Sequence, residues 1–155
     1  MPSFTIETAA SPADIEAVKH LFLEYLDFVE SYLGQDLKFQ KTDEEFSTFP
    51  AFYDALYVAK IDGKAVAACG LKPFRGEICE LKRLYCQAAA RGKGLGRALI
   101  EFCLKDAKNR GYTEIYLDTD HGLVHANAIY EALGFKDIER YYDNPMDSRF
   151  MGRKL

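Results

Sequence analysis

The stretch Leu84–Arg97, which reads LYCQAAARGKGLGR, places Gly92, Gly94 and Gly96 between a segment typical of a strand and one typical of a helix. Glycine lets the backbone turn tightly and lets a ligand approach the main chain without meeting a side chain. A helix that begins after such a turn presents unpaired N–H groups and the positive end of its dipole. We therefore predict an anion site at residues 91–97, where phosphate is the usual occupant.

Two common phosphate-binding motifs do not match this turn. A dinucleotide-binding GxGxxG motif beginning at Gly92 would require glycine at position 97, where the chain has Arg97. A P-loop requires Gly-Lys followed by Ser or Thr, and the sequence contains no such triplet. The turn therefore belongs to another class of phosphate site.

The segments around the turn predict an α+β domain in which strands and helices alternate. Asp62-Gly63 suits a type I′ turn between two apolar runs, and Ser11-Pro12 suits the start of a helix. In residues 77–86, Glu80 and Lys82 alternate with Leu81 and Arg83, as in a strand with two different faces. The expected strands are 4–8, 55–61, 64–71, 77–86, 113–118, 135–141 and 147–155, the last two joined by a turn at 143–145, and the expected helices are 11–34, 42–50, 95–109 and 124–133.

Composition limits the function. With 155 residues, 48% hydrophobic and 28% charged, the chain is expected to form a single domain over residues 1–155. The net charge of −4 argues against a nucleic-acid partner. No apolar run approaches the roughly 20 residues that a membrane span needs, and the N-terminus does not resemble a signal peptide. We therefore expect a cytoplasmic protein with no membrane partner.

Charge and cysteine placement add two expectations. The first fifty residues contain ten acidic and three basic side chains, which would suit a cationic substrate, whereas the remainder is slightly basic, which would suit a polyphosphate. Cys69, Cys79, Cys86 and Cys103 form no CxxC pair and sit in apolar stretches, so we expect buried thiols. No cluster of metal-ligand residue types is present, so no metal is expected.

Two motifs in order carry a resemblance to a known family. Arg91, Gly94 and Gly96 match an Arg-x-x-Gly-x-Gly motif, and residues 126–135, ANAIYEALGF, match an Ala-x-x-x-Tyr-x-x-x-Gly-Phe motif. Together with the element order, they make the chain similar to the GCN5-related N-acetyltransferase (GNAT) family over nearly its whole length. The resemblance implies a central, mixed, mostly antiparallel twisted sheet of about seven strands flanked by about four helices. Cys86 and Ala88 depart from the family's valine and proline, and Leu123 replaces a frequent asparagine, so Asn127 is not assigned that cofactor contact.

The resemblance implies that acetyl-coenzyme A (acetyl-CoA) is the acyl donor and that its acetyl group passes directly to a primary amine. Tyr130 would act as the general acid for the departing thiolate, although a core tyrosine on an amphipathic helix is the alternative. Glu80 would act as the general base. The alternative is a strand-face carboxylate that forms an ion pair with Lys82 or with a basic side chain on the neighbouring strand. The expected cofactor-binding residues are Leu84, Tyr85, Cys86, Arg91, Gly92, Lys93, Gly94, Leu95, Gly96 and Arg97.

The acceptor is less defined. Glu24, Tyr25, His125 and Tyr141 are the candidate substrate-binding residues. As acceptor, a small-molecule amine, amino acid or polyamine is favoured over a protein. The resemblance also allows a homodimer, because small enzymes of that family are often dimers. Two other hypotheses remain: a catalytically silent acyl-CoA-binding sensor, and a nucleotide-phosphate binder of another class.

Overall fold

The computed structural model describes residues 3–33, 42–144 and 148–155. The elements, in chain order, are β1 (Phe4–Thr8), α1 (Pro12–Leu33), α2 (Thr42–Ser47), β2 (Ala55–Ile61), β3 (Lys64–Arg75), β4 (Ile78–Cys86), the short 3₁₀ turn η2 (Ala88–Ala90), α3 (Leu95–Asn109), β5 (Glu114–Asp120), α4 (Val124–Ala132), β6 (Lys136–Asp137) and β7 (Ser148–Lys154). Within these ranges, none of the helices combines the length and apolar character needed to cross a bilayer.

The strands form a seven-stranded sheet in the order β1-β2-β3-β4-β5-β7-β6. All neighbouring pairs are antiparallel except β4 and β5, which run parallel. The sheet is therefore mixed and mostly antiparallel, as expected. At the β2–β3 hairpin, Asp62 and Gly63 both have positive φ, 52° and 78°, which confirms the predicted turn.

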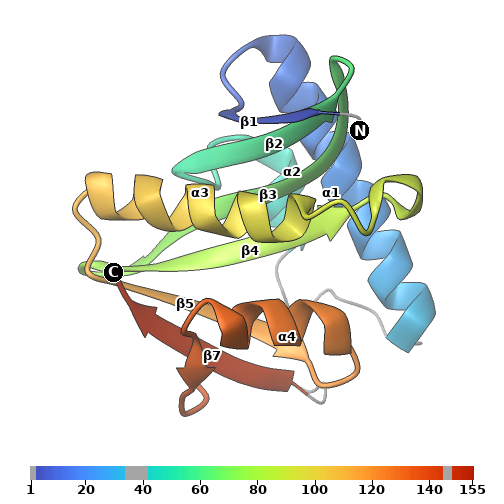
Figure 1. Ribbon diagram of the computed structural model, residues 1–155. Helices are drawn as coiled ribbons and strands as arrows, with labels where there is room; N and C mark the ends of the chain where they lie inside the picture. Colours follow the sequence, from blue (N-terminus) through green and yellow to red (C-terminus); the bar gives the residue numbers. More distant parts are fainter. Residues whose placement is uncertain (1–2, 34–41, 145–147) are drawn as a thin grey trace.

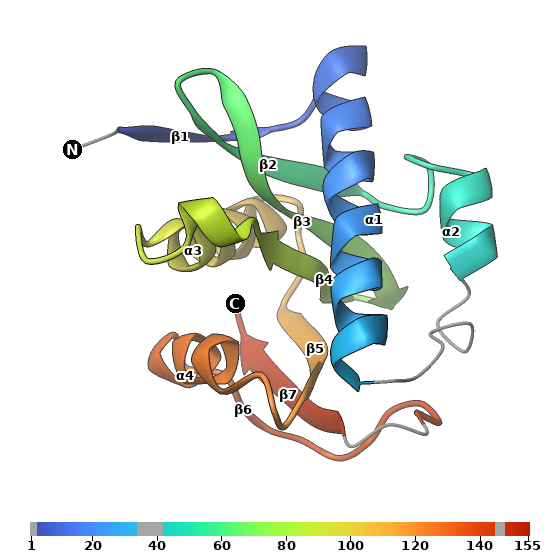
Figure 2. The same ribbon diagram turned by 90° about the vertical axis from the view of Figure 1, so that its right-hand side faces the viewer.

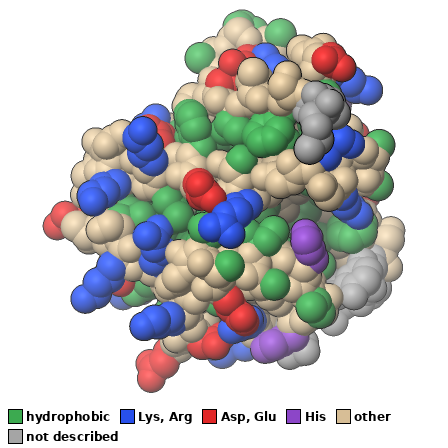
Figure 3. Space-filling view, in the orientation of Figure 1, with side chains coloured by type: hydrophobic (Ala, Val, Ile, Leu, Met, Phe, Trp, Pro, Cys, Tyr) green, Lys and Arg blue, Asp and Glu red, His purple; other side chains and the backbone are tan. Residues whose placement is uncertain are grey.

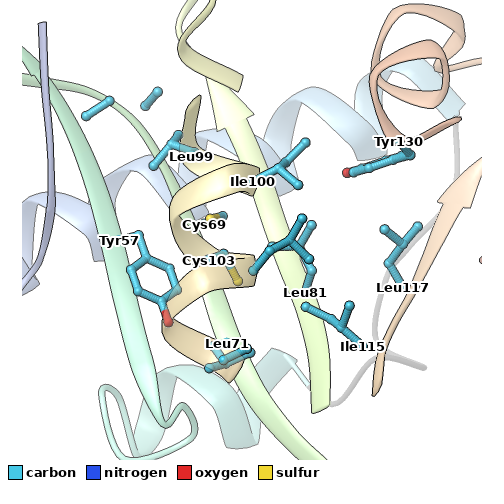
Figure 4. Packing of buried hydrophobic residues seen from close by; sticks show 14 of the residues in the cluster. Tyr57, Cys69, Leu71, Leu81, Leu99, Ile100, Cys103, Ile115, Leu117 and Tyr130 are labelled. Atoms are coloured by element: carbon cyan, nitrogen blue, oxygen red, sulfur yellow. The ribbon is translucent and has the colours of Figure 1, made fainter. Parts of the chain in front are cut away.

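The helices cover both faces of the sheet: α3 and α4 lie on one face, and α1 and α2 lie on the other (Figures 1 and 2). The α3 face buries Leu99, Ile100 and Cys103 against β2, β3 and β4 (Figure 4). Burying side chains of this size contributes roughly 1.5–3 kcal/mol each. On the other face, Val18 and Phe22 of α1 pack against β2 and β3. Cys69, Cys79 and Cys103 are buried as expected, whereas Cys86 is only half-buried.

The sheet divides between β4 and β5. These strands pair at only three positions, the last being Glu80 opposite Tyr116. Beyond it, β4 remains paired with β3 up to Cys86, and β5 remains paired with β7 up to Asp120. The ends of β4 and β5 diverge into a V, and α3 and α4 both begin at its open end (Figure 1). The edge of β4 that faces β5 therefore has no strand partner beyond Glu80 in the described part of the chain.

Arg83 interrupts the alternation expected for β4. It has a φ of 59°, and the register with β3 shifts there, from Lys82 opposite Gly70 to Tyr85 opposite Ala68. An extra residue of this kind is a β-bulge, which bends the strand and turns the next peptide. As a result Arg83 lies on the side of α2 and does not share the core face with Leu81.

The predicted strand at 135–141 is wrong in length, because β6 contains only Lys136 and Asp137. The chain leaves the sheet edge after Ile138, whose N–H still donates to the Phe150 carbonyl. Tyr141 and Tyr142 then extend toward carboxylates on β4 and β5 and no longer continue a strand. The predicted turn at 143–145 and the predicted end of the first helix at Gly34 lie partly or wholly outside the described residues.

Candidate active site

The glycine turn leaves the beginning of α3 open. Gly92 and Gly94 have φ values of 81° and 80°, and a Cβ at either position would meet no atom within 4 Å. Gly94 is the N-cap residue of α3, so no side chain hydrogen-bonds the first helical N–H groups. Leu95 is buried in the core, so it can offer a ligand only its backbone. The turn therefore has the shape and the free donors that a diphosphate requires.

The predicted cations lie around this turn. Arg91 donates from Nε to the Cys86 carbonyl at 3.0 Å, and its guanidinium lies 5.4 Å from the centre of the Phe28 ring. Lys93 Nζ lies 3.4 Å from the Ala89 carbonyl oxygen, whereas Arg97 forms an exposed ion pair with Glu101. In residues 3–33, 42–144 and 148–155, Arg91 and Lys93 form no ion pair, so both place positive charge close to the turn. Lys and Arg side chains are scattered over the face of the molecule on which α3 and α4 lie (Figure 3).

A cavity fills the V between β4 and β5. Its walls come from α1, β4, β5 and α4, and its lining residues are Tyr25, Leu81, Lys82, Arg83, Leu84, Asp118, Thr119, Leu123, Ala126 and Tyr130. Three predicted residues, Leu84, Tyr130 and Tyr25, therefore meet in one place. They come from three different elements, β4, α4 and α1.

Tyr130 points from α4 toward β4 (Figure 4). Its ring packs edge-on against Phe135, with the ring centres 5.7 Å apart. Its side chain lines the cavity, and its hydroxyl forms no hydrogen bond within the described residues. Burial raises the pKa of the Tyr130 phenol well above its ordinary value, so the hydroxyl keeps its proton at neutral pH.

Glu80 is 4% exposed and lies at the last closed rung of β4 and β5. Its Oε2 accepts a 2.8 Å hydrogen bond from the Tyr141 hydroxyl, and its Oε1 lies 3.9 Å from Lys72 Nζ. Two predicted residues, Glu80 and Tyr141, are thus in contact. Neither is among the residues that line the cavity.

Asp118, which sequence reasoning missed, is a second buried carboxylate on the same side of the sheet. Its Oδ2 accepts hydrogen bonds from the Tyr142 hydroxyl at 2.5 Å and from Asn144 Nδ2 at 3.2 Å. Its Oδ1 lies 3.6 Å from Lys82 Nζ, across the gap between β5 and β4. Asp118 is one of three acidic residues in β5, with Glu114 and Asp120, so no signal in the sequence distinguished it.

The remaining predicted residues lie elsewhere. Glu24 accepts hydrogen bonds from Gln87 Nε2 at 3.1 and 3.2 Å and so joins α1 to the end of β4. His125 is exposed on α4 and is not part of the cavity lining. Tyr85 packs against Tyr25, with ring centres 6.0 Å apart. The Thr119 hydroxyl donates a hydrogen bond to Asn127 Oδ1, and Asn127 Nδ2 donates one to the Asp120 carbonyl. These contacts hold α4 to β5.

Comparison with known proteins gives a consistent result. The model of the acetyltransferase (GNAT) family matches residues 15–135. An uncharacterised N-acetyltransferase of Schizosaccharomyces pombe is 33% identical over 150 residues, which cover 93% of this chain and 90% of the relative. The uncharacterised N-acetyltransferase YjgM of Escherichia coli is 32% identical over 133 residues, covering 83% and 78%.

Solved structures share the fold. A GNAT-family acetyltransferase from Staphylococcus aureus superimposes with a TM-score of 0.79 at 20% identity, covering 99% of both chains. The yncA protein of Salmonella typhimurium, solved with its cofactor acetyl-CoA, superimposes with a TM-score of 0.76 at 19% identity, covering 98% of this chain and 94% of the other. At these identities the likeness concerns the fold.

Proposed function

This chain belongs to the GNAT family of acetyltransferases, and from that premise we propose that it transfers the acetyl group of acetyl-CoA directly to a primary amine. The observation that carries the proposal is the V between β4 and β5, with an open helix N-terminus at its mouth and Tyr130 on its wall. A small amine, an amino acid or a polyamine is the acceptor we favour.

The donor side is supported by free backbone groups in two places. The N–H groups at the start of α3, with Arg91 and Lys93 nearby, would hold the diphosphate of coenzyme A. Among the residues that the structure describes, the edge of β4 from Leu84 to Cys86 has no strand partner on the β5 side, so its backbone is available to the pantetheine arm. When bound, acetyl-CoA supplies the acetyl group as an activated thioester.

Tyr130 fits the general acid. It is protonated at neutral pH, its side chain lines the cavity, and its hydroxyl has no competing hydrogen-bond acceptor in the described structure. A phenol in this state can give its proton to a departing thiolate. On the acceptor side, the buried carboxylates of Glu80 and Asp118 are the candidates for taking the proton of the amine.

Thiol release with acetyl-CoA and a panel of amines (spermidine, lysine and phenethylamine) tests the proposal. Wild type should turn over at least one amine, and Tyr130→Phe should lower kcat by roughly 10²-fold, the scale of general acid catalysis. The dissociation constant of acetyl-CoA should change less than about twofold, because the phenol ring and its packing remain. Tight acetyl-CoA binding without turnover of any amine would instead support a silent acyl-CoA sensor.

A further inference from the structure

We propose that Asp118, rather than Glu80, is the carboxylate that receives the proton of the acceptor amine; this inference rests on the proposed function. Glu80 occupies the strand position that the family resemblance favours. The geometry of the V separates the two carboxylates and points to the one on β5.

Position along the strands is the first argument. Glu80 lies opposite Tyr116, where β4 and β5 are still paired and the sheet is closed. Asp118 lies two residues further along β5, where the strands have separated, and it lines the cavity together with Leu84 and Tyr130. An amine that attacks a thioester held between Leu84 and Tyr130 would therefore enter a space that Asp118 borders and Glu80 does not.

The neighbours of each carboxylate are the second argument. The Tyr141 hydroxyl covers Glu80, and the side chain of Lys72, its nearest cation, also lies over the Phe52 ring at 5.0 Å. Within the described residues, Asp118 accepts two hydrogen bonds on Oδ2, whereas the contact of Oδ1 is with the ammonium of Lys82 at 3.6 Å. That distance is too long for a direct hydrogen bond, so Oδ1 keeps a lone pair for an incoming ammonium.

The chemistry balances with these groups. The acceptor enters as an ammonium, and Asp118 takes one proton from it, which frees the nitrogen lone pair for attack. The bond from nitrogen to the acetyl carbon forms and the carbon–sulfur bond breaks. A second proton leaves the nitrogen for solvent as the amide forms, and the thiolate takes a proton from Tyr130. Exchange with solvent then returns a proton to Tyr130 and removes the one on Asp118.

Several ionisable groups face Asp118. Lys82 comes from β4, Tyr25 from α1, Tyr130 from α4, and Tyr141 and Tyr142 from the segment after β6. The side chains of Glu80 and Asp120 supply further negative charge in the same region. Positive charge comes from Lys82, whose Nζ lies 3.6 Å from Asp118 Oδ1, and from Arg83, which lines the same cavity.

The test compares Asp118→Asn with Glu80→Gln, two substitutions that each replace a buried carboxylate with an amide of the same shape. With the most active amine of the panel, Asp118→Asn should lower kcat/KM for the amine by roughly 10²-fold or more, and Glu80→Gln by less than about tenfold. The acid limb of the pH profile of kcat/KM should persist in Glu80→Gln and change in Asp118→Asn. The acetyl-CoA dissociation constant should stay within about twofold in both.

A second measurement separates a base from a structural carboxylate. Added formate should restore part of the activity of Asp118→Ala but not of Glu80→Ala, because position 118 borders the cavity through which formate can enter, whereas position 80 lies outside the cavity lining and beside Tyr141. The exposed substitution Glu131→Gln serves as the control and should leave the rate unchanged.

A larger loss in Glu80→Gln, equal losses in both amide variants, or absence of formate rescue in Asp118→Ala would overturn the assignment. Absence of turnover by wild type would contradict the proposed function itself, and the inference would fall with it.

Discussion

Arg83 and Glu45 show how one pair of residues supports the shape of the site. Arg83 Nη2 lies 2.8 Å from Glu45 Oε1, and their side chains are only 4% and 0% exposed. The Tyr53 hydroxyl donates to the other oxygen of Glu45. The pair joins α2 to the bulge of β4 and so holds Arg83 at a positive φ that non-glycine residues rarely adopt.

We expect Glu45→Gln to destabilise the protein strongly, because it leaves a buried guanidinium without its carboxylate. The free energy of unfolding, measured by urea titration, should fall by about 3–5 kcal/mol. The matched substitution Glu101→Gln breaks an ion pair whose side chains are more than half exposed, and it should change the same quantity by less than about 1 kcal/mol. If both variants lost a similar free energy of unfolding, burial would not be the reason that the Glu45–Arg83 pair stabilises the protein.

At the scale of elements, the turn before α3 combines the left-handed backbone of Gly94 with the positive charges of Arg91 and Lys93. Gly94 caps the helix in the left-handed region, with open space where a Cβ would lie. The sequence pattern was sufficient to locate this element, because the requirement for glycine is local. The same pattern could not show that Arg91 contacts α1 through Phe28.

Gly94→Glu and Gly76→Glu form a matched pair for this element. Both glycines have positive φ and an open Cβ position, so both substitutions should cost roughly 1–2 kcal/mol of backbone strain. Gly76 lies in the connection between β3 and β4, away from the turn before α3. By calorimetric titration, Gly94→Glu should weaken acetyl-CoA binding at least roughly tenfold by charge repulsion, a difference of about 1.4 kcal/mol, and Gly76→Glu should not. Unchanged binding in Gly94→Glu would remove the turn from the cofactor site.

For the whole molecule, the divided sheet couples ligand binding to stability. The cavity walls come from α1, β4, β5 and α4, so a ligand in the V would contact both halves of the sheet. Anything that binds the folded state alone stabilises it by mass action.

Acetyl-CoA at about one hundred times its dissociation constant should therefore stabilise the protein by roughly 2.7 kcal/mol. For a chain of this length, the melting temperature should rise by several degrees, about 2–4 °C per kcal/mol. ATP and NAD at the same concentration should produce smaller shifts in a thermal unfolding assay. Stronger protection by either nucleotide than by acetyl-CoA would favour a nucleotide-phosphate binder.

The sequence by itself determined the features that depend on near neighbours. The Asp62-Gly63 turn, the start of α1 at Ser11 and the glycine turn each reflect a backbone preference or a hydrogen bond within a few residues. The order of these elements was enough to predict an α+β domain, whereas the mixed sheet and the role of Tyr130 followed from the resemblance to the GNAT family.

Only the tertiary structure decided which distant side chains meet. Glu80 and Tyr141 are 61 residues apart, and Arg83 and Glu45 are 38 apart, so no local pattern records either contact. The short β6 and the placement of Asp118 beside Lys82 also depend on contacts between distant segments, close to the point where β4 and β5 separate. Periodicity reports which face of an element is apolar, but long-range packing determines which polar groups share a buried space. The candidate base therefore depends on the tertiary structure.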